Sequence, residues 1–341
     1  EMQVSLQSVG TSRFFLPSAG RTVRPGTDSL VFGCQEPIAD GPRNAESPSP
    51  MAMVHSIRAQ PNAKIHLTRS TVKDLPVWVA SRQIDSIGLL HDGLLWNGTS
   101  SAMVDQPHDE TLFPDPEGVG RWAEHVYFQL LESGHRIPPG AGSGAGVTTN
   151  PLGYNRVYVH CGETFSPEAW WQGLRDGKVV LTNGPLLRPR ANGQLPGHVF
   201  RGYAGETLSL SVDVKLSTQE KVDYLEVIQN GRSIQHVRLD EWVSRKGELP
   251  DVEFERSGWM IVRAVTTNPK TYRYATSGPF YVEFDNQPRI SRSAVQFFLV
   301  WTYDRGRGIK IQDDGERQAV LKYYRAGRDY WEKRLAAETD E

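Results

Sequence analysis

Residues 208–216 read LSLSVDVKL, with a leucine or valine at every second position. A period of two places one side of a β-strand in a core and the other side in solvent. Similar short runs follow at 223–229, 233–239, 259–265 and 280–284, and Asn230-Gly231 is a strong signal for a tight hairpin turn. Five or more short strands within about 90 residues predict a small immunoglobulin-like β-sandwich over residues 196–287.

The chain before this region alternates between two kinds of pattern. Short apolar runs at 29–32, 63–67, 86–90 and 156–160 read as strands. Helical patterns lie between them, and the clearest has Trp122, Val126 and Leu130 four residues apart and Gly134 after its end. Strands that alternate with helices predict a mainly parallel sheet, so residues 1–195 are expected to form an α/β domain.

Two further helices are expected over residues 288–341. Ser291 is a plausible cap for the first helix, and Asp313 or Asp314 for the second. Both helices carry several aromatic residues, which favours packing against a domain over free solvation. The expected fold class is therefore α/β plus β with a C-terminal helical tail.

Composition excludes several classes of partner. The net charge is −2, with 38 basic and 40 acidic residues, so neither a nucleic-acid nor a membrane-surface role is supported. No apolar stretch is long enough to span a bilayer. The two cysteines, Cys34 and Cys161, cannot form a structural zinc cluster, and they are left as two buried thiols or one disulfide. The first residues lack the shape of a signal peptide and an initiator Met, which suggests a processed or truncated start.

A resemblance to a known family rests on several motifs in residues 136–200. The glycine-rich segment 137–146 leads to NPLGYNRVYV at 150–159, followed by WWQGLRDG at 170–177 and TNGPLL at 182–187. Together with DLPVWVAS at 74–81 and GRWAEH at 120–125, these motifs resemble the PHP (polymerase and histidinol phosphatase) superfamily, in its carbaryl-hydrolase-like (CehA/McbA) branch. The resemblance covers most of this chain. The part of a family member that it matches is mainly the C-terminal portion.

The resemblance implies a distorted α/β barrel with up to three divalent metals at the carboxyl ends of its strands. Such metals activate water for hydrolysis of phosphate esters or of related esters and carbamates. In the family, an early His-x-His pair and a late Gly-Ser-Asp-x-His segment supply ligands. Here Gly144 and Gly146 stand where the late Asp and His would be, and the sequence contains no His-x-His. The family's usual metal site therefore cannot be transferred to this chain.

Four other residues combine ligand chemistry with positions near predicted strand ends. These are His66, Asp74, His91 and Asp92. In a barrel, the carboxyl ends of the strands form the catalytic edge. Two histidines and a carboxylate would suffice for a single zinc or manganese ion, whereas local hydrogen bonding is the simpler explanation for each residue. We therefore expect no metal, and name these four residues as the ligands if one binds.

Further residues are candidates for substrate binding. Asn183, Arg188 and Arg190 lie near the predicted domain junction, where they could bind an anionic substrate or play a structural role. The loop 140–146 could cradle an anion, but it lacks the ending of a nucleotide-binding loop. Glu124 and His125 are expected on the polar side of their helix, as solvent-facing or loop-capping residues. Asn97-Gly98-Thr99 fits a glycosylation sequon, a short pattern that arises often by chance.

Two hypotheses about function stay open. The first is a PHP-like hydrolase with an altered or degenerate metal site, acting on phosphate ester or carbamate and ester bonds. The second is a non-catalytic descendant of the fold that binds a small-molecule or carbohydrate ligand. The resemblance supports the first hypothesis, and Gly144 and Gly146 support the second. The sequence specifies neither the oligomeric state nor the compartment.

Overall fold

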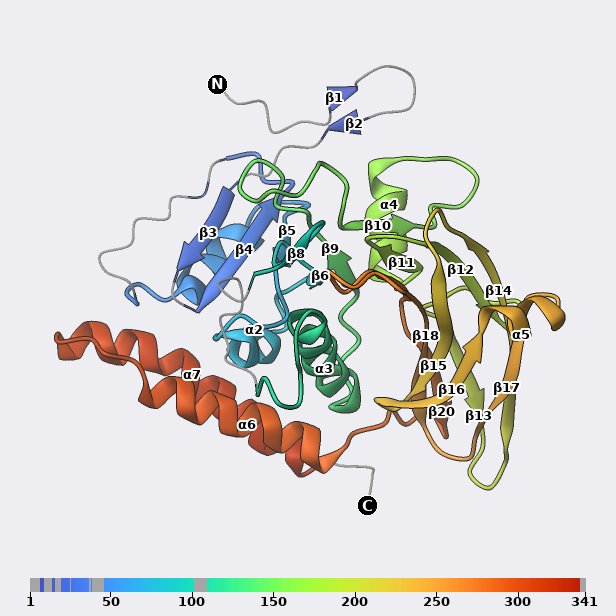
Figure 1. Ribbon diagram of the computed structural model, residues 1–341. Helices are drawn as coiled ribbons and strands as arrows, with labels where there is room; N and C mark the ends of the chain where they lie inside the picture. Colours follow the sequence, from blue (N-terminus) through green and yellow to red (C-terminus); the bar gives the residue numbers. More distant parts are fainter. Residues whose placement is uncertain are drawn as a thin grey trace.

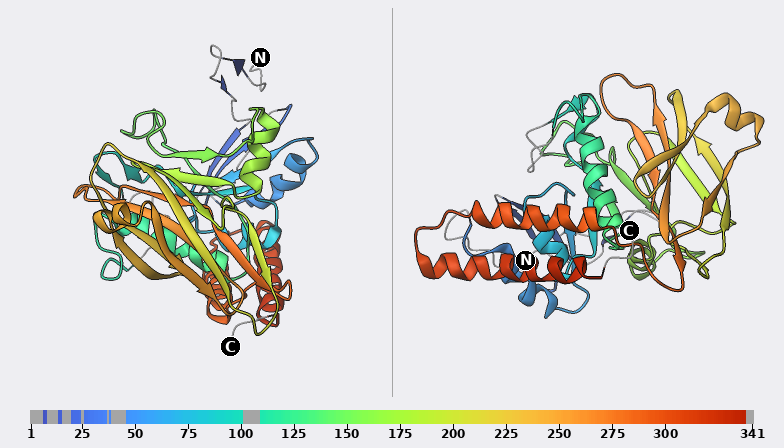
Figure 2. Two further views of the ribbon diagram at one scale, coloured as in Figure 1. Left: turned by 90° about the vertical axis from the view of Figure 1, so that its right-hand side faces the viewer. Right: turned by 90° about the horizontal axis from the view of Figure 1, so that it is seen from below.

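The computed structural model describes residues 7–8, 14–15, 20–24, 26–36, 38, 46–100 and 109–337. A part with helices around a small sheet lies beside a part made mostly of long strands, and two C-terminal helices run along the first part (Figure 1). Figure 2 shows the same arrangement from the side and from below. This mixture confirms the expected α/β plus β class in its coarse form.

The first part is built on a five-stranded sheet in the order β3-β4-β5-β6-β9. Its strands are Gly20–Arg24, Thr27–Phe32, Lys64–Leu67, Ser86–Leu90 and Pro139–Ala141. Strands β5, β6 and β9 are parallel to one another, while β3 and β4 are antiparallel to their neighbours. The expectation of a mainly parallel sheet is therefore wrong for this edge. The physical reason is the tight turn around Gly26, which joins β3 and β4 directly and so requires an antiparallel pair.

Short helices and one long helix accompany this sheet. They are the 3-10 helix η1 (Pro50–Met53), α1 (Val54–Arg58), α2 (Leu75–Ser81) and α3 (Gly118–Glu132). Helix α3 buries Trp122, Val126 and Leu130, the apolar stripe expected from the sequence. Two small antiparallel pairs complete this part, β1 (Gln7–Ser8) with β2 (Phe14–Phe15) and β7 (Leu94–Leu95) with β8 (Gly98–Thr99).

The second part contains an eight-stranded and a three-stranded sheet around a shared core. The eight-stranded sheet comprises β10 (Arg156–Val159), β11 (Val179–Thr182), β13 (Val199–Gly202), β15 (Val222–Gln229), β16 (Arg232–Arg238), β18 (Gly258–Thr266), β19 (Tyr274–Ser277) and β20 (Phe280–Phe284). The three-stranded sheet comprises β12 (Leu186–Ala191), β14 (Leu208–Ser217) and β17 (Glu248–Phe254). Leu210, Val212 and Val214 of β14 pack in one cluster with Val262 and Ala264 of β18, so the strand with period two buries the side that its sequence predicts.

The run at 156–160 is expected in the parallel sheet of the first part, and this placement is wrong, because β10 lies with β11 in the eight-stranded sheet. They pair antiparallel with each other, and β11 pairs antiparallel with β19. The helix between them, α4 (Pro167–Arg175), is capped by the Ser166 hydroxyl, which accepts a hydrogen bond from the Ala169 amide. Hydrogen bonds of this sheet cross the predicted boundary at residue 195, and the division into domains stays a prediction.

The two C-terminal helices, α6 (Arg292–Arg307) and α7 (Asp314–Leu335), dock on the start of α2. The indole nitrogen of Trp301 donates to the carbonyl of Lys73 at 2.8 Å, and that of Trp331 donates to the carbonyl of Pro76 at 3.1 Å. The aromatic side chains thus pack on the first part, as their number predicts. No helix in the described ranges combines the length and the apolar composition needed to cross a membrane.

Candidate functional site

The carboxyl ends of three strands meet at one edge of the five-stranded sheet. Because β4 runs antiparallel to β5, its first residues lie beside the carboxyl end of β5, where the Thr68 backbone amide donates to the Asp28 carbonyl at 3.0 Å. Strands β6 and β9 end at the same edge, where the Gly142 amide donates to the Leu90 carbonyl at 2.9 Å. Ligand sites of α/β sheets lie at such carboxyl edges. This edge is therefore the natural candidate site.

Two arginines and two aspartates form an ionic cluster there, which we call the edge cluster: Arg21, Asp28, Arg69 and Asp92. Arg21 binds Asp28 with two hydrogen bonds, from Nε at 2.9 Å and from Nη2 at 2.7 Å. Arg69 lies between the two carboxylates, 3.3 Å from Asp28 Oδ2 and 3.4 Å from Asp92 Oδ1. Arg21 Nη2 is also 3.9 Å from Asp92 Oδ2. Each carboxylate thus has two guanidinium groups beside it.

The edge cluster is almost completely buried. Asp28, Arg69 and Asp92 are all buried, and only Arg21 reaches solvent to a substantial degree. Burial alone would raise the pKa of the Asp92 carboxyl, but the neighbouring His91 ring and the charges of Arg69 and Arg21 outweigh it and lower that pKa. Asp92 is therefore held as a carboxylate by its neighbours.

The glycine-rich loop after β9 closes over Asp92. Gly144 has a positive φ of +60°, and a Cβ atom at this position would lie 2.6 Å from the Cβ of Asp92. An aspartate could not take the place of Gly144 unless the loop moved. Two asparagines of the NPLGYN motif hold this loop on the segment after β6: Asn150 Nδ2 donates to the carbonyls of Leu94 and Ser143, and Asn155 Nδ2 donates to the carbonyl of His91 at 2.8 Å.

The structure places the four predicted metal ligands in three different environments. His91 and Asp92 lie in the candidate site, with His91 Nδ1 3.8 Å from Asp92 Oδ1. His91 Nδ1 accepts a hydrogen bond from the Gly93 amide, and Nε2 is a buried atom without a partner among the described residues. His66 Nδ1 is 2.8 Å from the Ser86 hydroxyl, and its ring faces Gly140.

Asp74, the fourth predicted ligand, belongs to the contact with the C-terminal helices. Its carboxylate accepts hydrogen bonds from Arg305 Nε at 2.7 Å, from the Tyr324 hydroxyl at 2.6 Å and from Thr27 Oγ1 at 3.2 Å. Although Asp74 precedes α2 in the chain, its side chain does not cap that helix. Within the described residues, no three His, Cys, Asp or Glu side chains gather in a metal-binding arrangement.

The three predicted substrate-binding residues do not share one surface. Asn183 is buried, and its amide donates to the Tyr272 carbonyl at 3.0 Å and accepts from the Tyr274 amide at 2.8 Å. Arg188 and Arg190 are exposed on β12, opposite Lys215 and Asp213 of β14. Asn183 therefore fixes the backbone on either side of residue 273, and substrate binding by this trio stays a prediction.

Glu124 is not on a solvent-facing side of α3, contrary to the expectation. It is only 2% exposed, pairs with Arg263 of β18 and accepts a hydrogen bond from the Tyr272 hydroxyl at 2.9 Å. Arg263 also binds Glu226 of β15, through Nε at 2.9 Å. The polar side of α3 faces the eight-stranded sheet because this buried ionic group joins the two parts of the chain. His125 is half-buried and stacks on Trp122, with ring centroids 5.5 Å apart.

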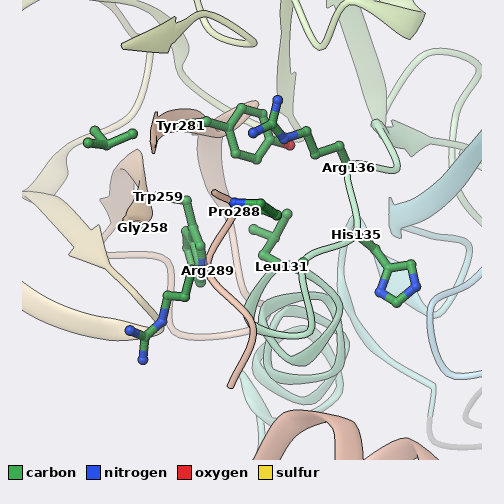
Figure 3. A pocket seen from close by; sticks show the side chains of 10 residues that line it. Leu131, His135, Arg136, Gly258, Trp259, Tyr281, Pro288 and Arg289 are labelled. Atoms are coloured by element: carbon green, nitrogen blue, oxygen red, sulfur yellow. The ribbon is translucent and has the colours of Figure 1, made fainter. Parts of the chain in front are cut away.

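A small hollow of about 10 Å³, room for about one water molecule, lies at the same junction, between the end of α3 and strands β18 and β20 (Figure 3). The indole of Trp259 donates to Glu132 at 2.8 Å, and Arg136 lies over the ring of Tyr281. The His135 ring points away from the other labelled side chains, and its Nε2 is 2.7 Å from the hydroxyl of Tyr330 in α7. Pockets for small ligands usually exceed about 300 Å³, so we interpret this hollow as part of the packed junction.

Comparisons with known proteins add little to this geometry. No family model and no curated protein matches the sequence. Among solved structures, the chain is similar to the fibronectin(III)-like modules of Clostridium thermocellum CbhA, with 12% identity over 28% of this chain and 97% of that chain. The TM-score of 0.19 is too low for this similarity to support an argument about the fold or the function.

Two buried histidines predict how stability depends on pH. Burial lowers the pKa of His66 to about 4, and burial together with the charge of Arg334 lowers that of His135 to about 3. In the unfolded chain both rings take up a proton below about pH 6.5, so the folded state should lose stability as the pH falls from there towards 4. The His66 shift alone corresponds to about 3 kcal/mol.

Urea denaturation at several pH values measures this effect. The series runs from about pH 7, just above the ordinary pKa of histidine, down to about pH 4, the pKa of His66 in the folded chain. His66→Asn should reduce the slope of the free energy of unfolding against pH, because the substituted side chain no longer titrates. The exposed His55→Asn serves as the control. An unchanged slope in His66→Asn would show that His66 does not contribute to it.

Proposed function

We propose that this chain is a non-catalytic descendant of the PHP fold that binds a ligand. The observation that carries the proposal is the edge cluster. In the PHP-like arrangement that we propose for the first part, this edge would face the family's divalent metals. Its two carboxylates are paired instead with Arg21 and Arg69.

The donor set of the edge cluster does not suit a divalent cation. A metal ion would have to bind Asp28 or Asp92 while two guanidinium groups stand within 4 Å of the oxygens of each carboxylate. Displacing a buried arginine from its carboxylate leaves an uncompensated charge, which typically costs about 3–5 kcal/mol. In the proposed function the two arginines neutralise the carboxylates, as metal ions would in the family. The site then carries out no hydrolysis.

A strip of surface residues at the junction of the two parts supports a carbohydrate as the ligand. Trp96 at the turn between β7 and β8 is 52% exposed, and Tyr158 of β10 is 45% exposed. Arg273 donates to the Trp96 carbonyl at 3.0 Å and packs against Gly184, whose carbonyl accepts from Arg156 at 3.1 Å. Arg156 in turn donates to the Tyr158 hydroxyl at 3.2 Å. We call this continuous set the Trp96–Tyr158 strip.

The chemistry of the strip fits a sugar chain better than a small anion. Exposed aromatic rings offer flat apolar faces for the C–H faces of sugar rings, and the tyrosine hydroxyl can bond to sugar hydroxyls. The arginines of the strip already bind neighbouring carbonyl groups, and Arg273 also pairs with Glu220, which reduces their attraction for an anion. Asn183 would then support the strip indirectly, because its side chain fixes the backbone that carries Arg273. We also propose that the second part is an immunoglobulin-like sandwich, which supports the surface that carries the strip.

Substitution of the strip tests ligand binding. A panel of soluble polysaccharides is screened by affinity electrophoresis, and a ligand of the parent chain is then titrated by calorimetry. Trp96→Ala and Tyr158→Ala should each weaken binding by about tenfold, the usual loss for truncation of an aromatic anchor. Tyr203→Ala is the matched control, because Tyr203 is 73% exposed and lies outside the strip. Failure of every polysaccharide to bind, or equal weakening in the control, would contradict the assignment.

The hydrolase stays as a second candidate because of one observation. His91 Nε2 is buried in the candidate site without a partner among the described residues, so it is available to a group that enters the site. A ligand that enters beside the edge cluster could accept a hydrogen bond from it. In this alternative the altered site would still act on phosphate esters, esters or carbamates.

A substrate screen separates the two candidates. Model phosphate, ester and carbamate substrates are tested with Mn²⁺, with Zn²⁺ and without added metal. We expect no turnover that depends on metal, because the carboxylates of the edge cluster are bound to arginine. Turnover that is abolished by a chelator, restored by metal and lost in a His66→Ala/His91→Ala double variant would establish the hydrolase instead.

A further inference from the structure

The chain contains four Asn-Gly dipeptides, at Asn97, Asn183, Asn192 and Asn230. In such a pair the backbone nitrogen after asparagine can attack the side-chain amide, because glycine has no Cβ to obstruct the approach and allows unusual backbone angles. The reaction requires the asparagine side chain to rotate freely towards its own backbone. Hydrogen bonds that hold the side chain, or burial, therefore slow it.

Three of the four asparagine side chains are held. The Asn183 amide is buried and bonded at both ends to backbone groups. Asn192 accepts from the Ser211 amide at 2.8 Å, and Asn230 accepts from the Trp259 amide at 2.9 Å. Asn192 and Asn230 also have positive φ angles in tight turns, which their side-chain bonds help to fix.

Asn97 differs from these three in the freedom of its side chain. It is exposed in the two-residue turn between β7 and β8, and its side chain has no hydrogen-bond partner in the part of the chain that the structure describes. Gly98 has a φ of +150°, and no atom of the described residues lies within 4 Å of the position that a Cβ would take there. Among those residues, the space beside Gly98 is therefore open.

We propose that Asn97 is a site of spontaneous deamidation. The Gly98 nitrogen bonds to the side-chain carbonyl carbon of Asn97, and the bond from that carbon to Nδ2 breaks. The proton from the Gly98 nitrogen leaves with the amide group as ammonia, which leaves a five-membered succinimide ring. Water then opens the ring at either carbonyl and gives aspartate or isoaspartate. No electron transfer and no cofactor is involved.

The modification would alter the Trp96–Tyr158 strip, although the inference does not depend on the strip's proposed role. The product carries one new negative charge beside Trp96, whose carbonyl accepts a hydrogen bond from Arg273. Isoaspartate also adds one atom to the backbone of a two-residue turn, which changes the course of the hairpin. Because Asn97 begins a glycosylation sequon, a sugar on Nδ2 would block the reaction.

The test uses the full chain, produced in a host without N-glycosylation and incubated at mildly alkaline pH. Peptide mapping by mass spectrometry, with chromatographic separation of aspartate from isoaspartate, follows all four sites over time. In the folded protein Asn97 should react about tenfold faster than the other three, as expected if each of those must first break one or two hydrogen bonds. A parallel incubation in concentrated urea should bring the four rates close together.

The Asn97→Gln variant should lose the reactive site and leave the three slow sites unchanged, since a glutamine would have to form a larger ring. The proposal is overturned if Asn97 in the folded chain reacts no faster than the other three. It is also overturned if Asn97 stays intact when folded and reacts only in urea, because the hairpin would then protect it.

Discussion

The carboxylate of Asp28, held between Arg21 and Arg69, is the interaction on which the first part of the molecule depends. Asp28 is the second residue of β4, Arg21 comes from β3 and Arg69 follows β5, so one buried carboxylate joins three strands. Arg69 extends the contact to Asp92 after β6. A buried ion pair of this kind adds little net stability, but the loss of one partner is costly because the other charge is left without compensation. The cluster therefore fixes the geometry of the edge.

The start of β4 connects this edge to the C-terminal helices. Next to Asp28, the Thr27 hydroxyl donates to Asp74, which also binds Arg305 and Tyr324. Neighbouring residues of a strand point to opposite faces, so β4 serves the edge cluster on one face and the docking of α6 and α7 on the other. At the far side of the first part, Glu124 and Arg263 attach α3 to the eight-stranded sheet. Buried charges thus mark each contact between separate parts of the chain.

Sequence patterns predicted the local structure well and the partners of its charged residues poorly. The strand at 208–217, the Asn230-Gly231 turn and the apolar stripe of α3 follow from short-range periodicity and turn chemistry. The carboxyl end of β6 was also expected to place His91 and Asp92 at a site. Arg21, Asp28 and Arg69 were missed, because nothing local indicates that an arginine 41 positions further along will face Asp28. Asp74 illustrates the same limit, since its partner Arg305 lies 231 residues away.

The free energy of unfolding of Asp28→Asn tests the central claim most directly. The substitution keeps the shape of the side chain but removes the charge that compensates Arg21 and Arg69. We expect a loss of about 3 kcal/mol in urea denaturation, as for other buried ion pairs that lose one partner. Asp304→Asn is the matched control, because its pair with Arg307 is exposed at 3.7 Å and should contribute less than about 1 kcal/mol. Equal stability of the two variants would contradict the account.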